Sequence, residues 1–149
     1  KPRNLIKNSN VKGICTTDDP ADDLHLHKLI ARDEEKDGFK TLPALRPDKL
    51  IHIELPTYAE YMTKLGSAAG VEIKNFADIE KTMHQRFEFF TLMGGALSDH
   101  SLETFHFEEA SQAEVDIIIS KSLNKEVLTQ NEVNRYVTAL RVLLMKLNN

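Results

Sequence analysis

The chain has 149 residues, of which 41% are hydrophobic and 28% charged, with 6 Gly and 5 Pro. This composition is typical of one globular domain, and it excludes a disordered or fibrous chain. A chain of this length can bury roughly 70% of its unfolded surface, which is enough for a hydrophobic core. The net charge of −4 and the lack of a basic stripe argue against nucleic-acid binding.

The single cysteine, Cys15, excludes an intramolecular disulfide and a Cys-rich zinc site, which fits a cytoplasmic protein. No apolar run approaches the ~20 residues of a membrane span, so we expect no membrane contact. The first residues, Lys1–Asn4, lack an initiator Met and a following apolar segment, so they are no secretory signal. Because a helical pattern continues to Asn149, we expect the chain to be a piece of a longer protein.

The first third of the chain alternates between strand and helix signals. The apolar, β-branched run Val11–Thr17 predicts a buried strand. Asp19 can cap a following helix and Pro20 suits its first position, with the charged run Asp33–Gly38 as a solvated turn after it. A second strand is predicted at Lys40–Leu45. This alternation is typical of a parallel sheet with crossover helices.

Helical signals dominate from residue 57 onward. Three Ser/Thr-x-x-Glu capping boxes and one Asn cap predict four helix starts: Thr57 with Glu60, Asn75, Ser111 with Glu114, and Thr129 with Glu132. The helices are expected over residues 57–65, 76–93, 112–123 and 130–147. The stripe from Phe76 to Phe90 is interpreted as helix packing. After Gly94 and Gly95, the segment Ala96–His100 is predicted to be a third short strand.

All three predicted strands end in polar residues. These ends are Thr16–Asp19, Arg46–Lys49 and Ser98–His100. In parallel α/β folds the carboxyl ends of the strands carry the functional site, because the following loops converge there. The three ends therefore predict one shared site.

The same three segments resemble motifs of the uronate isomerases, the glucuronate/galacturonate isomerase family of the amidohydrolase superfamily. Cys15–Pro20 resembles the family's T-T-D-D-P segment, Leu42–Lys49 its L-P-x-W-R-P-D-K segment, and Ser98–His100 its S-D-H segment. The chain departs from the pattern at Leu45, where Trp is usual, and at Ser101, where Gly or Ala is usual. The resemblance covers nearly the whole chain but only about a third of a family member.

The resemblance implies a helix-rich α/β fold, a partial (β/α)8 TIM barrel with three parallel strands and a helical insertion. Its parts would be β/α units over 1–50, the insertion over 51–94, and the third strand with its helices over 95–149. The implied activity is aldose–ketose isomerisation of D-glucuronate to D-fructuronate and of D-galacturonate to D-tagaturonate, in a cytoplasmic homo-oligomer. Moving the proton through an enediol requires an acid/base group and an electrophile.

The electrophile that the resemblance implies is a divalent metal, zinc, in the full-length enzyme. The family's metal ligands match nothing in this chain, so no cofactor is expected in it. We therefore expect the isolated chain to be inactive.

Three residues are the candidate site residues. Arg46 is expected to bind the substrate carboxylate, because a guanidinium forks onto a carboxylate as Lys cannot. The alternative is a surface ion pair with Asp48. Asp99 and His100 are the candidate catalytic residues, Asp99 to hold a substrate hydroxyl or share in proton transfer; the alternatives are a helix or loop cap for Asp99 and a structural role for His100.

His25 and His27 invite a metal-site interpretation, which we reject. An H-x-H pair shares a face on a strand, but on a helix the two side chains project about 200° apart. We interpret the pair as part of a solvated helix face. Cys15, in an apolar strand, is expected to be a small core residue.

Four carboxylates cluster between the first strand and its helix. Asp22 and Asp23 are explained by the helix dipole, which favours acidic residues at a helix start. Asp18 and Asp19 belong to the first family motif, and we prefer a structural role for them in the strand-to-helix turn.

Two other functions remain open. The first is a hydrolase of the same superfamily acting on a carboxylated substrate. The second is a free-standing, non-catalytic helical interaction module, which predicts a self-sufficient core and no binding of small acids. A barrel fragment would instead expose strand edges and tend to associate.

Overall fold

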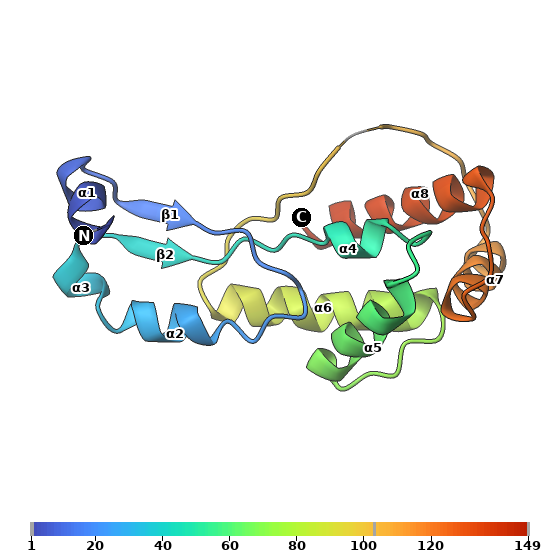
Figure 1. Ribbon diagram of the computed structural model, residues 1–149, viewed down its shortest axis with the longest axis horizontal. Helices are drawn as coiled ribbons and strands as arrows, with labels where there is room; N and C mark the ends of the chain where they lie inside the picture. Colours follow the sequence, from blue (N-terminus) through green and yellow to red (C-terminus); the bar gives the residue numbers. More distant parts are fainter. Residues whose placement is uncertain (1, 103, 149) are drawn as a thin grey trace.

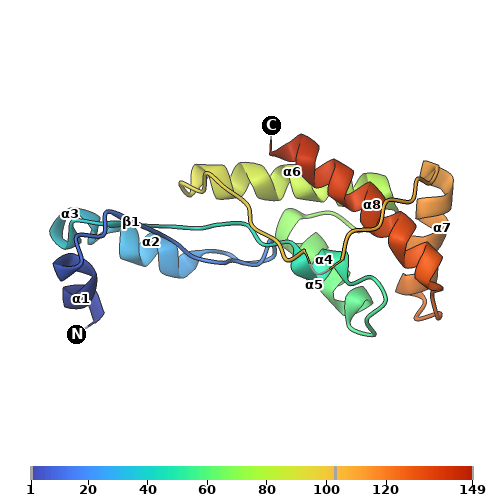
Figure 2. The same ribbon diagram turned by 90° about the horizontal axis from the view of Figure 1, so that it is seen from above.

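A computed structural model describes residues 2–102 and 104–148, so Lys1, Glu103 and Asn149 lie outside the described residues. The elements in chain order are α1 (Pro2–Asn8), β1 (Gly13–Cys15), α2 (His25–Ala31), α3 (Glu34–Asp37), β2 (Lys40–Leu42), α4 (Asp48–Ile51), α5 (Tyr58–Ala69), α6 (Phe76–Leu92), α7 (Gln112–Leu123) and α8 (Gln130–Leu147). The molecule is elongated (Figures 1 and 2). The two strands and α1 to α3 form one end, and α4, α5, α7 and α8 gather toward the other.

β1 and β2 pair in parallel, which confirms the predicted direction. The register places Gly13 opposite Lys40 and Cys15 opposite Leu42. Both strands are shorter than predicted, and β2 stops before Pro43, which has no N–H to continue the ladder. The prediction of a buried strand with Cys15 in the core is wrong, because α2 packs on β2 while Cys15 is exposed to solvent.

The third predicted strand, 96–100, is also wrong within the described residues. Only Ser98 pairs with the neighbouring segment, opposite Leu45, through bonds from Leu45 N to Leu97 O and from Asp99 N to Leu45 O. The close packing of Gly95, where a Cβ would lie 2.9 Å from Pro43 O, brings this segment beside residue 45 without a longer ladder.

The N-terminal helices also differ from expectation. Asp19 does not cap a helix at Pro20; its Oδ1 accepts from Ala21 N in a tight turn, and α2 begins only at His25. The predicted solvated turn at 33–38 contains α3. Asp37 in α3 is buried because Arg3 and Lys7 of α1, a helix the sequence did not predict, pair with its carboxylate at 3.0 and 3.6 Å.

The later helices confirm most of the capping predictions. Asn75, Ser111 and Thr129 each accept from the third backbone N–H of α6, α7 and α8 in complete capping boxes. Thr57 forms no such cap, because its φ and ψ of −83° and −5° are already helical.

α5 also continues past its predicted end at Leu65 and stops at Gly70, whose φ is +66°. Gly66 lies inside α5 because a Cβ there would collide with the carbonyl of Val71, whose N–H bonds back to Gly66 O. The glycine therefore serves close packing and does not end the helix.

The hydrophobic core lies among α4 to α8. Two tyrosines cross at its centre, with ring planes 87° apart. Tyr136 donates to Leu50 O at 3.0 Å, so its one hydroxyl proton is used, and Tyr58 must donate to Tyr136 across 2.8 Å. Burial raises the pKa of both phenols, which therefore stay neutral. The pair ties α4, α5 and α8 together.

Replacing Tyr136 with Phe is expected to lower the free energy of unfolding by about 2–3 kcal/mol, since Leu50 O and the Tyr58 hydroxyl both lose their partner. Tyr58→Phe is the matched control and should cost only about 1 kcal/mol, because Tyr136 still donates to Leu50. Urea denaturation measures both. Equal losses in the two variants would contradict this hydrogen-bond direction.

Glu132 joins α7 to the start of α8. The Lys121 ammonium, at 2.6 Å, and then the backbone and hydroxyl of Thr129 lower the pKa of the Glu132 carboxyl to about 2. A lowered pKa means that the folded state favours the carboxylate, so this stabilisation is present above the ordinary pKa of 4.5 and is lost as the pH falls toward 2.

We expect Glu132→Gln to reduce the pH dependence of the free energy of unfolding between pH 4.5 and about 2. Urea titrations at several pH values compare the variant with the unsubstituted chain. Unchanged slopes in this interval would show that the contacts of Glu132 do not contribute to acid sensitivity.

Candidate active site at the strand ends

The three polar segments that follow the predicted strands lie side by side. Asp18 pairs with Leu45 and Leu45 pairs with Ser98, so segment 44–46 is central and the other two flank it. The chain runs parallel at both pairings, which brings the three carboxyl ends to the same edge. The three segments therefore lie together, as one shared site at the strand ends would require.

Arg46 and Asp99 meet at this edge although 53 residues separate them. Arg46 Nε and Nη2 both donate to Asp99 Oδ1, at 3.0 and 2.7 Å. The two side chains remain 40% and 39% exposed, so the pair is open to a ligand. Asp48, the alternative partner, also contacts Arg46, with 3.5 Å between Oδ2 and Nε.

The pairing leaves part of Arg46 available. A guanidinium has five N–H donors, and Asp99 engages the side formed by Nε and Nη2. Within residues 2–102 and 104–148, Arg46 Nη1 has no hydrogen-bond partner and Asp99 Oδ2 accepts no hydrogen bond. The outer edge of Arg46 can therefore fork onto a carboxylate, while Asp99 Oδ2 can accept from a neighbouring hydroxyl.

His100 is not brought into this pair. It is exposed, and its ring has no hydrogen bond with any residue of the described chain. Its neighbour Ser101 donates its backbone N–H to Asp48 Oδ1 at 3.0 Å, which attaches the following loop to the start of α4. The structure thus joins Arg46 with Asp99 and leaves His100 exposed to solvent outside this pair.

Asp19 holds the turn together, in agreement with the structural role we preferred. Its Oδ1 accepts from Ala21 N and from the Tyr61 hydroxyl, and its Oδ2 pairs with Lys49 at 2.8 Å. Burial, and then the charge and hydrogen bond of Asp19, raise the pKa of Tyr61, so the phenol stays neutral. These contacts fix the first motif against α4 and α5.

The interpretation of His27 as part of a solvated helix face is wrong. His25 is exposed, but His27 is buried, with Nε2 2.8 Å from Thr16 Oγ1 and 3.7 Å from Asp18 Oδ2. The spacing of the two histidines gave no sign of this contact, because Thr16 lies on another element. Asp22 and Asp23 do lie at the start of α2, where they accept from the backbone N–H groups of residues 24 and 25.

Arg86 is a buried residue that the sequence did not single out. Its guanidinium donates to three backbone oxygens, Pro20 O at 2.6 Å, Asp22 O at 2.7 Å and Ala68 O at 3.1 Å. It also lies over the ring of Phe89, 4.2 Å from the centroid. Burial lowers the pKa of this guanidinium. Arg86 thereby holds the turn after the first motif against α5 and α6.

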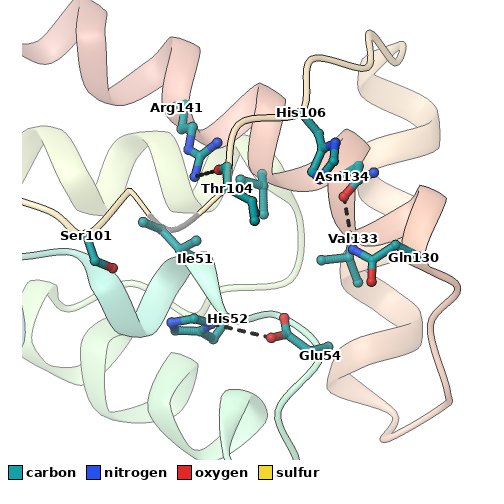
Figure 3. Close-up of a pocket in the computed structure, with 11 residues that line it drawn as sticks. Ile51, His52, Glu54, Ser101, Thr104, His106, Gln130, Val133, Asn134 and Arg141 are labelled. Carbon is teal, nitrogen blue, oxygen red and sulfur yellow. Dashed lines mark hydrogen bonds and ion pairs between the residues drawn. The ribbon is translucent and has the colours of Figure 1, made fainter.

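A pocket of about 170 Å³ is lined in part by Ser101, whose backbone N–H bonds to Asp48 (Figure 3). Its wall includes Ser101 from the loop, His52 after α4 and Arg141 of α8. Two of its polar side chains already have partners in the same wall. His52 Nδ1 lies 3.3 Å from Glu54 Oε1, and Arg141 donates to Thr104 O at 3.1 Å.

No group of three or more His, Cys, Asp or Glu side chains that could hold a metal ion occurs in the described part of the chain. No helix in that part is long and apolar enough to cross a membrane.

These observations define a helix-rich α/β protein with a polar site at the carboxyl ends of parallel segments. The sequence profile of the family described as glucuronate isomerase matches residues 1–149, so the chain belongs to that family. Uronate isomerase of Latilactobacillus sakei is 57% identical over 99% of this chain, and that of Lactococcus lactis is 53% identical over the same share. The chain spans 31% of the length of each relative.

Solved structures agree with this assignment. The crystal structure of uronate isomerase from Thermotoga maritima superposes on 99% of this chain with a TM-score of 0.89 and 28% identity, and the chain covers 32% of it. Glucuronate isomerase from Caulobacter crescentus superposes with a TM-score of 0.85 at 20% identity, over 99% of this chain and 30% of its own, which shows the shared fold.

Proposed function

We propose that the whole protein containing this chain is an aldose–ketose isomerase that converts D-glucuronate to D-fructuronate and D-galacturonate to D-tagaturonate. The supporting observation is the exposed Arg46–Asp99 pair at the strand ends, in a chain 57% identical to a uronate isomerase. The same proposal makes this chain part of a (β/α)8 barrel of the amidohydrolase superfamily, in a cytoplasmic homo-oligomer.

In this proposal Arg46 binds the carboxylate of the open-chain sugar through its outer Nη edge. The carboxylate and the reacting carbons C1 and C2 lie at opposite ends of a hexuronate. Because Asp99 contacts Arg46 directly, its free Oδ2 would accept from a hydroxyl near the carboxylate and so orient the sugar chain. His100, an exposed residue next to Asp99, is the candidate acid/base group.

The proposed reaction also requires an electrophile at C1 and C2. A divalent metal, zinc in our proposal, would polarise the substrate oxygens there. The described residues do not fit a metal centre, so its ligands would come from parts of the protein that this chain does not include. No step carried out by Arg46 or Asp99 depends on the identity of that metal.

An isomerisation assay with D-glucuronate and D-galacturonate tests the proposal. We expect the whole protein, supplied with a divalent metal, to form the matching ketose, and the isolated 149-residue chain to form none. Hydrolysis of sugar lactones without isomerisation would instead favour a hydrolase. Turnover by the isolated chain would contradict the need for groups outside it.

A further inference from the structure

A relay of hydrogen bonds connects α2 with the backbone that carries Arg46. It begins at His27, whose Nε2 lies 2.8 Å from Thr16 Oγ1. Thr16 Oγ1 lies 2.6 Å from Asp18 Oδ2, and Asp18 contacts segment 44–46. The side chains of His27 and Asp18 are only 10% and 13% exposed, so neither is placed to contact a substrate.

The direction of each bond follows from the donors available. The Thr16 hydroxyl has one proton and two acceptors within reach, Asp18 Oδ2 at 2.6 Å and Leu42 O at 3.3 Å. The shorter contact, with the carboxylate, takes this proton. His27 must then donate to Thr16 Oγ1, which places a hydrogen on His27 Nε2. The relay therefore runs from His27 to Thr16 to Asp18, with every member engaged.

Asp18 makes three further hydrogen bonds, two with Ala44 and one with Arg46. Its N–H donates to Ala44 O at 2.9 Å, its Oδ2 accepts from Ala44 N at 3.3 Å, and its carbonyl accepts from Arg46 N at 2.8 Å. The backbone on both sides of Leu45 is thereby fixed to the first motif. The position of the Arg46 side chain depends on where Asp18 is held.

We propose that Thr16, Asp18 and His27 are positioning residues, which set Arg46 for recognition of the substrate carboxylate. This inference rests on the proposed function, because it assumes that Arg46 binds that carboxylate. A buried side chain with a locked partner keeps a binding group within the narrow tolerance that recognition requires. The first motif therefore acts on substrate binding without touching the substrate.

The test uses the whole protein and two matched pairs of variants. Thr16→Val keeps the shape but removes the hydroxyl, whereas Thr16→Ser keeps it. His27→Gln keeps a donor near the place of Nε2, whereas His27→Asn does not. We expect Thr16→Val and His27→Asn to raise KM for D-glucuronate roughly tenfold with kcat little changed, and Thr16→Ser and His27→Gln to rescue most of this loss.

A double-variant cycle with Arg46→Met shows whether the effect passes through Arg46. If it does, Thr16→Val raises KM in the unsubstituted protein but not in the Arg46→Met background. Equal increases in both backgrounds, or an unchanged KM in Thr16→Val and His27→Asn alike, overturn the positioning role. An unchanged KM in Arg46→Met itself overturns carboxylate recognition by Arg46, and this separates a failure of the proposed function from a failure of the relay.

Discussion

Replacing Arg86 with Met is expected to lower the free energy of unfolding by about 3–5 kcal/mol, because three backbone carbonyls lose a charged donor at once. The carbonyls of Pro20, Asp22 and Ala68 lie on two separate segments, the turn after the first motif and α5, which this guanidinium bridges. Met preserves much of the apolar stem and its contact with the Phe89 ring, so the loss isolates the hydrogen bonds.

Urea denaturation provides the measurement, and Arg32→Met is the matched control. Arg32 follows α2 and is exposed, so its substitution should change the free energy of unfolding by less than about 0.5 kcal/mol. Arg86→Lys should fall between the two, since an ammonium cannot reach three carbonyls with the planar geometry of a guanidinium. Equal stability of Arg86→Met and Arg32→Met would show that Arg86 does not anchor the turn.

The second large effect concerns activity. Arg46→Met is expected to lower kcat/KM for D-glucuronate roughly 100-fold or more, because the charge-assisted bonds to the substrate carboxylate are lost and Asp99 loses its partner. Arg46→Lys keeps the charge but not the fork, so KM should rise roughly 10-fold or more. Steady-state kinetics of the whole protein measures both variants.

Arg32→Lys is the control for Arg46→Lys and should leave both constants unchanged, since Arg32 is an exposed residue at the end of α2. The substrate offers a second comparison. An aldose without the carboxylate should be turned over equally by the unsubstituted protein and by Arg46→Lys. If Arg46→Lys slows both substrates to the same extent, Arg46 acts on something other than the carboxylate.

The sequence predicted best those features that depend on neighbours along the chain. The predicted boundaries of α7 and α8 agree with the structure. So do three of the four predicted N-caps, because an N-cap forms between residues three positions apart. The predicted cap at Thr57 was wrong because the backbone at that residue is already helical, which the sequence pattern does not indicate. Gly66 misled the prediction because its role depends on how the chain turns back after α5 and places the Val71 carbonyl against it.

Strand burial and length could not be predicted in the same way. The run around Cys15 has the composition of a buried strand, yet in this chain it is exposed, because burial depends on what covers both faces of the sheet. Arg46 and Asp99 were expected at the same edge from their positions at strand ends and from the resemblance, but their direct contact was not predicted. The contacts of His27 and Arg86 were missed because their partners are backbone and side-chain atoms on other elements.

The most direct test of the account is a crystal structure of the whole protein with the acid obtained by reducing the aldehyde of D-glucuronate, which cannot isomerise. The account predicts that Arg46 Nη1 and Nη2 lie within hydrogen-bond distance of the ligand carboxylate, with Asp99 still on the Nε side. A carboxylate bound by other residues, with Arg46 engaged only by Asp99 and Asp48, would contradict it.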